Sequence, residues 1–444
     1  MGIAKKSLID FTSQIIVFFL TFISGITLSM ILGPEGRGIW VATLFANTLL
    51  HNLSCLSLEI TNIYLTGKEA DKAQKIHSWS VALIVIISII VFLIAFLFEG
   101  TLRVRVFVNI PRLYYWIGVS MVPFSLYYAG WRGIMVGLGE IKRLSIVTII
   151  YQFLQAILII ALLLILKNPL LGLIISWAIV QICLVFVLGI VLYKILNKTI
   201  FAKLDFSVLR KMLKFGVVAH IGNLATTLIV RVDWIYISNF LGSLGLGIYS
   251  QATTFTDKVA LIPQAVERGA YSKVCSSDTK EAQQLIIKIF RNTLYTVALT
   301  ILLIFIFGSI LIYFVLPKFR DAIYPLRVLL LGTLFYALAR VFAMYFSGHK
   351  GQPKIPTIIA WVFLIFNATL NYFLIKNFLL PGAAIGTTLS FSLIFLVYFH
   401  LFIRELPEFR FRDFFILKKE DILTYKSLIK EIFAKALEIL WGNK

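Results

Sequence analysis

Long apolar runs without a charge are the feature that most constrains the fold of this chain. Residues 81–98 and 299–316 each form such a run, and about 20 apolar residues are enough to cross a bilayer as a helix. Overall, 60% of the residues are hydrophobic and 14% are charged, with a mean hydropathy of +0.93. Soluble domains are about half apolar and a quarter charged. This composition excludes a soluble enzyme, a disulfide scaffold and a disordered chain, and it predicts an all-α polytopic membrane protein.

Charged residues, glycines and prolines separate the apolar runs into twelve predicted transmembrane helices with short connections. Their expected ranges are 8–32, 39–64, 78–98, 113–136, 144–166, 171–193, 215–240, 248–271, 293–316, 326–347, 355–375 and 382–403. The first run is too long for a cleavable signal peptide, so we expect it to be retained. Pro123 and Pro263 are expected to kink the fourth and eighth spans.

The distribution of cations predicts the orientation of the chain. The formal net charge is +21, and 28 cations fall on the side of the N-terminus against 9 on the opposite side. By the positive-inside rule, both termini are expected in the cytoplasm, and nucleic acid is not needed to explain the charge. The three cysteines have no metal-ligand spacing, so no metal site is predicted.

An internal repeat divides the chain into two halves of six spans. Residues 32–40 read LGPEGRGIW and residues 241–249 read LGSLGLGIY, 209 positions later and on the same side of the membrane. Two such halves form a parallel repeat, and transporters built from repeats bind substrate near the midplane. The predicted domains are a six-helix bundle (1–193), a cytoplasmic linker (194–214), a second six-helix bundle (215–403) and a basic tail (404–444).

The tail has apolar residues at helical spacing over 420–441, with lysines on its other faces. This pattern favours a helix on the inner leaflet that is attracted by anionic lipids. A surface helix packed on cytoplasmic loops is the alternative.

Cations inside the spans are the main candidates for substrate binding, because an ionisable side chain deep in a bilayer is costly unless it faces protein or water. The candidates are Arg231, Lys258, Arg132 and Arg340. Arg132 and Arg340 lie 208 positions apart, so they are expected to be counterparts in the repeat. A cavity with cations at several depths suits an anionic substrate. The alternatives are snorkelling to headgroups for Arg132 and Arg340, and structural ion pairs for Arg231 and Lys258.

Polar residues that recur along single helix faces predict the lining of that cavity. They are His220, Asn223, Thr227 and Trp234 in the seventh span, Asp257 and Gln264 in the eighth, and Asn52 and Glu59 in the second. For His220, hydrogen-bonded helix packing is the alternative. Transport coupled to an H⁺ or Na⁺ gradient would need a carboxylate, and the candidates are Asp233, Asp257, Glu59 and Glu267. These acids could instead compensate the cations. No other cofactor is predicted, because nucleotide-binding and hydrolase motifs are missing.

Three segments resemble bacterial polysaccharide flippases of the O-antigen type. They are LGPEGRGIW (32–40), RVDWIYISNFLGSLGLGIYSQA (231–252) and NATLNYFLIKNFLLPGAAIGTTLS (367–390). These flippases belong to the multidrug/oligosaccharidyl-lipid/polysaccharide exporter (MOP) superfamily. The resemblance implies two six-helix bundles around a central cavity, a MATE-like fold, in the bacterial inner membrane. It also implies alternating access that moves undecaprenyl-pyrophosphate-linked oligosaccharide to the outer leaflet, with Arg231 among the residues that hold the substrate. The basic tail argues against the lipid II branch, which has two further helices.

The expected partners are the lipid-linked glycan, anionic membrane lipids and the polysaccharide polymerisation machinery, and no nucleic acid. An ion-coupled multidrug antiporter of the same fold is the first alternative, although the charged residues deep inside the predicted spans are mainly basic. A membrane enzyme, such as an oligosaccharide polymerase, is the second. Such enzymes need a large outer loop or an acidic metal-binding motif, and the longest outer loop here, 99–112, carries one acid and three arginines.

Overall fold

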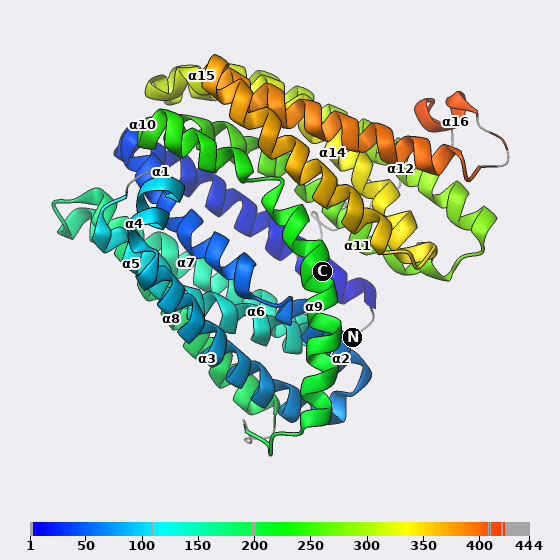
Figure 1. The fold of residues 1–444 in the computed structure, drawn as a ribbon, viewed down its shortest axis with the longest axis horizontal. Coiled ribbons are helices and arrows are strands. Elements are labelled where there is room, and N and C mark those ends of the chain that lie inside the picture. Colours follow the sequence, from blue (N-terminus) through cyan, green and yellow to red (C-terminus); the bar gives the residue numbers. More distant parts are fainter. Residues whose placement is uncertain are drawn as a thin grey trace, which may run out of the picture. The chain divides into compact units, whose positions relative to one another are not determined.

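The computed structural model describes residues 3–107, 110–196, 201–406, 408, 410–418 and 421, except the side chains of 3–20, 163–164, 262, 265–266, 268–269 and 272. Every regular element in these ranges is helical (Figure 1). The predicted all-α class is therefore confirmed. The predicted amphipathic helix over 420–441 lies outside the described residues, apart from Asp421.

The elements follow the chain in the order in which the sequence predicts them. The helices of the first half are α1 (Ile3–Ser54), α2 (Leu58–Lys68), α3 (Ala73–Leu97), α4 (Glu99–Thr101), α5 (Arg112–Ser120), α6 (Val122–Gly137), α7 (Ile141–Ile165) and α8 (Pro169–Ile195). The helices of the second half are α9 (Phe206–Leu228), α10 (Val232–Val259), α11 (Leu261–Ser276), α12 (Thr279–Leu303), α13 (Ser309–Val315), α14 (Ile323–Met344), α15 (Lys354–Ile403) and α16 (Phe411–Phe415).

Three of these helices are hairpins. The backbone leaves helical geometry at Gly33 in α1, Gly242 in α10 and Leu379 in α15. In α10 the Tyr249 hydroxyl donates to the Asp233 carboxylate at 2.6 Å, although a straight helix would separate residues 16 apart by about 24 Å. In α15 the Asn371 amide reaches the Thr387 hydroxyl at 3.4 Å over the same sequence separation. Each of these two helices therefore folds back on itself as two antiparallel segments.

By length and composition, six helices of the described residues can cross a membrane, or up to eight when each of two bent pairs is counted as one span. Since each hairpin turn lies between two predicted spans, as in α15, which contains both 355–375 and 382–403, the helices are consistent with the twelve predicted spans. The expected proline kinks are confirmed: α6 begins at Val122, next to Pro123, and α11 begins two residues before Pro263. The predicted continuity of two spans is wrong, because the second bends by 50° at 55–57 and the seventh bends by 41° at 229–231.

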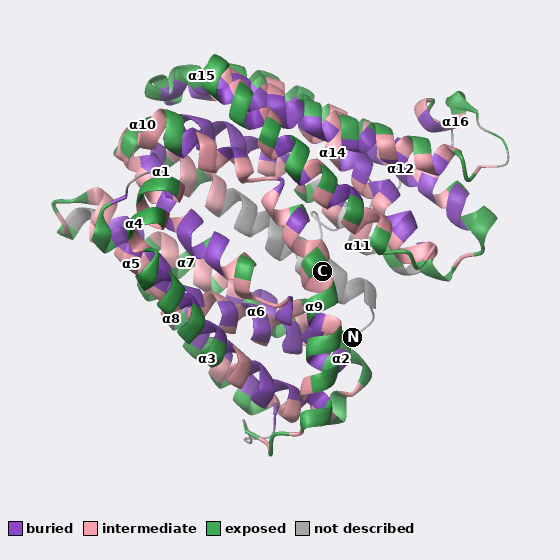
Figure 2. Ribbon diagram, viewed as in Figure 1, coloured by how far each residue is buried: buried purple, intermediate pink, exposed green. Residues whose placement is uncertain are grey.

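Large apolar side chains remain exposed along the long helices. On α3, Ile89 is 63% exposed and Leu97 64%, and Figure 2 shows exposed residues along α3, α8 and α15. A soluble protein rarely exposes so much contiguous apolar surface. The chain is therefore a membrane protein, and these faces are suited to contact lipid.

The structure divides into two compact units. One contains the described residues of Met1–Thr254, Ser309–Leu326 and Thr357–Thr387, and the other those of Phe255–Gly308, Arg327–Pro356 and Thr388–Lys444. We call them the first and second units and describe each by itself. The predicted domain boundaries at 193, 214 and 403 stay predictions.

The internal repeat has a structural counterpart within the first unit. Gly33 has a φ of 65° and Gly242 a φ of 66°, a left-handed conformation that glycine adopts without strain. A Cβ added to Gly38 would overlap the carbonyl oxygen of Ser243. At the positions related by the repeat, a Cβ added to Gly247 would overlap the carbonyl oxygen of Pro34. The two glycine motifs therefore pack backbone against backbone.

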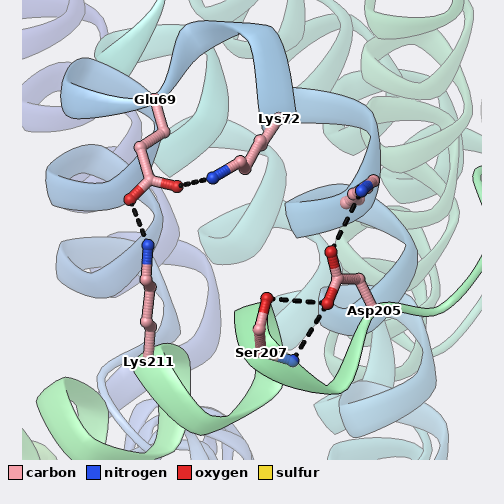
Figure 3. Close-up of polar contacts among 6 residues, drawn as sticks. Glu69, Lys72, Asp205, Ser207 and Lys211 are labelled. Carbon is pink, nitrogen blue, oxygen red and sulfur yellow. Dashed lines mark hydrogen bonds and ion pairs between the residues drawn. The ribbon is translucent and has the colours of Figure 1, made fainter.

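An ion-pair cluster anchors the start of α9 to the turn between α2 and α3 (Figure 3). Glu69 binds Lys72 at 2.7 Å and Lys211 at 2.5 Å. Asp205 caps α9 through the backbone N–H of Ser207 at 3.0 Å, and it binds Lys75 at 3.0 Å. The hydrogen bonds from the two lysines lower the pKa of Glu69 to about 2. The hydrogen bonds from Ser207 and Lys75 lower the pKa of Asp205 to about 2.

This cluster predicts a loss of stability in acid. Carboxyls with lowered pKa values stabilise the fold fully above their ordinary values of 4.5 and 3.8, and the contribution is lost as the pH falls toward 2. We expect the melting temperature of the purified protein to fall over this range, and to fall less steeply in a Glu69→Gln, Asp205→Asn variant. Asp71→Asn, at an exposed neighbour, is the control. Parallel slopes in all three proteins would contradict the prediction.

Candidate functional site

A break between α1 and α2 forms the base of a polar cavity in the first unit. Leu56 and Ser57 have φ values of 44° and 47°, which interrupt the helix. Helix α9 packs on this break: a His220 ring nitrogen lies 3.2 Å from the carbonyl oxygen of Leu53, and the Asn223 amide donates to the Ser57 hydroxyl at 3.1 Å. Side chains of α9 thus satisfy polar groups that the break leaves outside regular helix.

The cavity beside this break has a volume of about 210 Å³. It is lined by His51, Asn52, Cys55, Ser57, Leu58, Glu59, Ile60, Ala129, His220, Asn223, Leu224 and Thr227. Five of the eight predicted cavity-lining residues meet here: Asn52, Glu59, His220, Asn223 and Thr227. Sequence reasoning missed His51, Cys55 and Ser57, because it treated this span as a continuous helix. Alternating hydroxyl, amide, imidazole and carboxylate groups can hydrogen-bond a polar ligand such as a sugar.

Two of the predicted cations form ion pairs that the repeat relates. In the first unit, Arg132 on α6 binds Glu59 on α2 at 3.1 Å. In the second unit, Arg340 on α14 binds Glu267 on α11. Both the arginines and the glutamates lie 208 positions apart. The same Glu–Arg pair therefore occurs once in each half of the chain.

The pair in the second unit borders a cavity of about 430 Å³, which is lined by Gln264, Glu267, Tyr271 and Arg340. All four side chains carry polar groups. Its glutamate and its arginine neutralise each other. Gln264 thus lies with Arg340 rather than with the cavity beside α9.

Sequence spacing places Arg231 on the same polar helix face as the other polar residues of the predicted seventh span, but the structure separates it from them. The break at 229–231 separates it from His220, Asn223 and Thr227, and it lines a different, apolar groove with Leu228, Tyr236 and Ala368. Its guanidinium lies 4.6 Å from the ring centre of Trp234, within cation–π range. Trp234 in turn packs edge-on against Phe45, with ring centres 5.6 Å apart. The structure therefore places Trp234 beside Arg231 and not in the polar cavity.

Lys258 and Asp257 lie in the last turn of α10, just before the break at Ala260. Both side chains are half-buried. Arg231 immediately precedes α10 and Lys258 nearly ends it, so each of these cations lies at a helix break within a predicted span.

Asp233 lies in a buried cluster of oxygen atoms in the first unit. Its carboxylate is 2% exposed and accepts hydrogen bonds from the Tyr249 hydroxyl at 2.6 Å and the Thr387 hydroxyl at 3.3 Å. Asn371 reaches Thr387, and the buried Oδ1 of Asn371 accepts no hydrogen bond from the described residues. The hairpins of α10 and α15 bring these residues together. Oxygen ligands of this kind suit a proton or a hard monovalent cation. Among the described residues, no group of three His, Cys, Asp or Glu side chains forms a metal site.

Arg37 is a buried cation that sequence reasoning placed in an outer turn. It is 7% exposed, and its guanidinium donates to the hydroxyls of Ser29 at 2.5 Å, Ser250 at 2.9 Å and Thr254 at 2.8 Å. It therefore joins α1 to α10. The signal that could have revealed it is the repeat, since the corresponding residue of the second motif is Leu246.

A family model described as polysaccharide biosynthesis protein matches residues 3–262, more than half of the chain. The chain belongs to this family. Relatives of this chain include an uncharacterised membrane protein of Methanocaldococcus jannaschii, 23% identical over 89% of this chain and 97% of the relative. A protein of Shigella flexneri that is proposed to be an O-antigen transporter is 27% identical over 40% of this chain and 43% of its own length.

Solved structures share the fold. The lipid II flippase MurJ in an inward closed conformation has a TM-score of 0.71 at 16% identity, over 93% of this chain and 89% of that chain. A multidrug resistance MATE family transporter of the MOP superfamily, in an inward-facing conformation, has a TM-score of 0.67 at 15% identity. The match covers 85% of this chain and 94% of that chain. The prediction is therefore confirmed for the polysaccharide biosynthesis family and for the MATE-like fold.

Proposed function

We propose that this polysaccharide biosynthesis family member is a flippase that moves undecaprenyl-pyrophosphate-linked oligosaccharide from the inner to the outer leaflet by alternating access. The observation that carries the proposal is the placement of Arg231 and Lys258 at the two ends of α10, inside predicted spans. A cation in such a place is costly unless it meets protein, water or an anionic ligand. A pyrophosphate supplies that anion, and the polar cavity beside α9 supplies hydrogen bonds for sugars.

The multidrug antiporter is the second candidate, because MATE transporters share the fold. A cationic drug needs carboxylates in the cavities. Glu59 and Glu267 line the two polar cavities, and each is held by an arginine. These pairs make the cavities poor sites for a cation and favour the flippase. A membrane enzyme has less support, since the family and the shared fold point to transport.

We propose the inner membrane as the location, with both termini in the cytoplasm, on the strength of the cation asymmetry. Anionic lipids and the polysaccharide polymerisation machinery stay expected partners. Export assayed in cells whose own flippase is deleted tests the function: restored glycan export supports it, and restored drug tolerance without export supports the antiporter.

We propose further that Asp233, with Tyr249, Asn371 and Thr387, holds the coupling H⁺ or Na⁺. The buried Oδ1 of Asn371, which has no hydrogen-bond partner among the described residues, supports this assignment. Asp257, Glu59 and Glu267 are weaker candidates, because the two glutamates are engaged in ion pairs and Asp257 is only half-buried.

The coupling proposal predicts that Asp233→Asn makes transport insensitive to the ion gradient, because the amide keeps the shape and loses the charge that binds the ion. Transport in proteoliposomes is measured with and without H⁺ and Na⁺ gradients. Asp321→Asn, at an exposed carboxylate of an outer turn, is the control and should respond like the wild-type protein. A gradient response that survives in Asp233→Asn would remove Asp233 from the coupling site.

A further inference from the structure

An apolar groove of about 610 Å³ lies in the first unit. It is lined by Phe45, Leu228, Arg231, Val232, Ile235, Tyr236, Leu364, Ile365, Ala368, Thr369, Tyr372 and Phe373. Among the described residues that line it, Arg231 is the one that carries a charge. Eight of its twelve described lining residues are wholly apolar, so the groove suits a hydrocarbon chain better than the hydroxyls of a sugar, and Arg231 suits an anion at its end.

The groove is elongated along α15. Its residues on that helix recur at intervals of four, as 364, 368 and 372 and as 365, 369 and 373, which form two adjacent rows on one face. The rows extend about 13 Å along the helix axis. Ile365 is 65% exposed and Phe373 57% exposed, so the wall is open at its side and a chain can enter from the surrounding lipid. This shape fits one extended hydrocarbon chain.

The groove adjoins the polar cavity on a single helix. Thr227 lines the polar cavity and Leu228, the next residue, lines the groove. Arg231 follows about one helical turn later, at the break between α9 and α10. The first unit therefore presents a polar cavity, a cation and an apolar groove along one stretch of chain.

We propose that this groove holds the polyprenyl chain of the lipid-linked glycan while Arg231 holds its phosphate and the polar cavity receives its first sugars. The proposal rests on the proposed function and names the part of the protein that recognises each part of the substrate. A bilayer phospholipid would match the cation and the groove but would leave the polar cavity without a role. The occupant that matches all three features is the carrier-linked glycan.

The test compares two probes and three variants of the full chain in detergent. The probes are undecaprenyl pyrophosphate disaccharide and the same head group as a pyrophosphate methyl ester. Ala368→Trp fills the groove, Val362→Trp places the same bulk at an exposed position of α15 outside the groove, and Arg231→Gln removes the cation. Melting temperatures show which variants fold.

Ala368→Trp is expected to weaken binding of the full-chain probe by about tenfold or more, which corresponds to roughly two methylene groups returned to water, and to leave the methyl ester unchanged. Val362→Trp should affect neither probe, and Arg231→Gln should weaken both. As a measurement that needs no variant, a full-chain probe with a diazirine in the polyprenyl chain should crosslink the wild-type protein at residues that line the groove, on α15 (364–373) or on α9 and α10 (228–236).

Crosslinks elsewhere, or equal binding of the full chain by the wild-type protein and by a folded Ala368→Trp, would overturn the groove assignment and leave the proposed function standing. The same holds if phosphatidylglycerol purifies with the wild-type protein and not with Ala368→Trp while substrate binding is equal. A wild-type protein that binds neither probe would overturn the proposed function and the groove together.

Discussion

Replacing Arg231 and Lys258 together with alanine is expected to abolish glycan export while folded protein still accumulates. Both cations are half-buried at helix breaks within predicted spans, where a charged hydrogen bond to pyrophosphate is stronger than in bulk water. Each such bond contributes about 1.5–3 kcal/mol, so the loss of both should reduce transport by about 100-fold or more. The measurement is glycan export in cells without their own flippase, with the amount of variant in the membrane fraction as the normalisation.

Two comparisons separate charge from structure. Arg231→Lys keeps a positive charge and should retain part of the export, although it loses the bidentate geometry of the guanidinium. Lys376→Ala, at an exposed cation on α15, should export normally. Normal export by the double variant, at wild-type protein levels, would contradict the assignment of these residues to substrate binding.

Gly38→Ala and Gly247→Ala are expected to cause the largest losses of stability. At each position the new methyl group would overlap a backbone carbonyl oxygen, that of Ser243 or of Pro34, and a backbone cannot move aside as a flexible side chain does. Overpacking costs about 1–3 kcal/mol where side chains can adjust, and we expect at least that here. Melting temperature and the yield of monodisperse protein measure the effect.

Gly25→Ala is the matched control for these variants, because it lies in the same helix α1 and no atom of the described residues lies within 4 Å of the added Cβ. It should melt with the wild-type protein. If Gly38→Ala and Gly247→Ala melt with it, the two glycine motifs do not pack as the structure shows.

Features that depend on local chemistry could be predicted from the sequence. Apolar length alone predicts where helices form, prolines predict the breaks before α6 and α11, and the repeated glycine motif predicts two turns that share the left-handed conformation at Gly33 and Gly242. The stripe on the seventh span also predicts correctly that His220, Asn223 and Thr227 share one cavity.

Helix breaks that no proline or glycine marks could not be predicted from the sequence. Neither 55–57 nor 229–231 contains proline or glycine, so nothing indicates that the helix breaks there. The second break moves Arg231 out of the polar stripe and into the apolar groove. The two Glu–Arg ion pairs that the repeat relates were predicted only in part. The repeat relates Arg132 to Arg340, but it does not indicate which carboxylate each arginine binds.

The buried positions of Arg37 and Asp233 depend on hairpins whose partners lie far along the chain. Arg37 bonds to residues more than 200 positions away, and Asp233 bonds to Thr387. Sequence spacing can identify both as charged residues near a turn or a span, but it cannot pair them with hydroxyls from α10 and α15.

The most direct test of the central claim is translocation of labelled undecaprenyl-pyrophosphate-linked oligosaccharide in proteoliposomes, with the glycan supplied on the cytoplasmic face. We expect transfer to the opposite leaflet by the wild-type protein and none by the Arg231→Ala, Lys258→Ala variant. Absence of translocation of any lipid-linked glycan, together with efflux of a small organic cation by the same vesicles, would contradict the flippase and establish the antiporter.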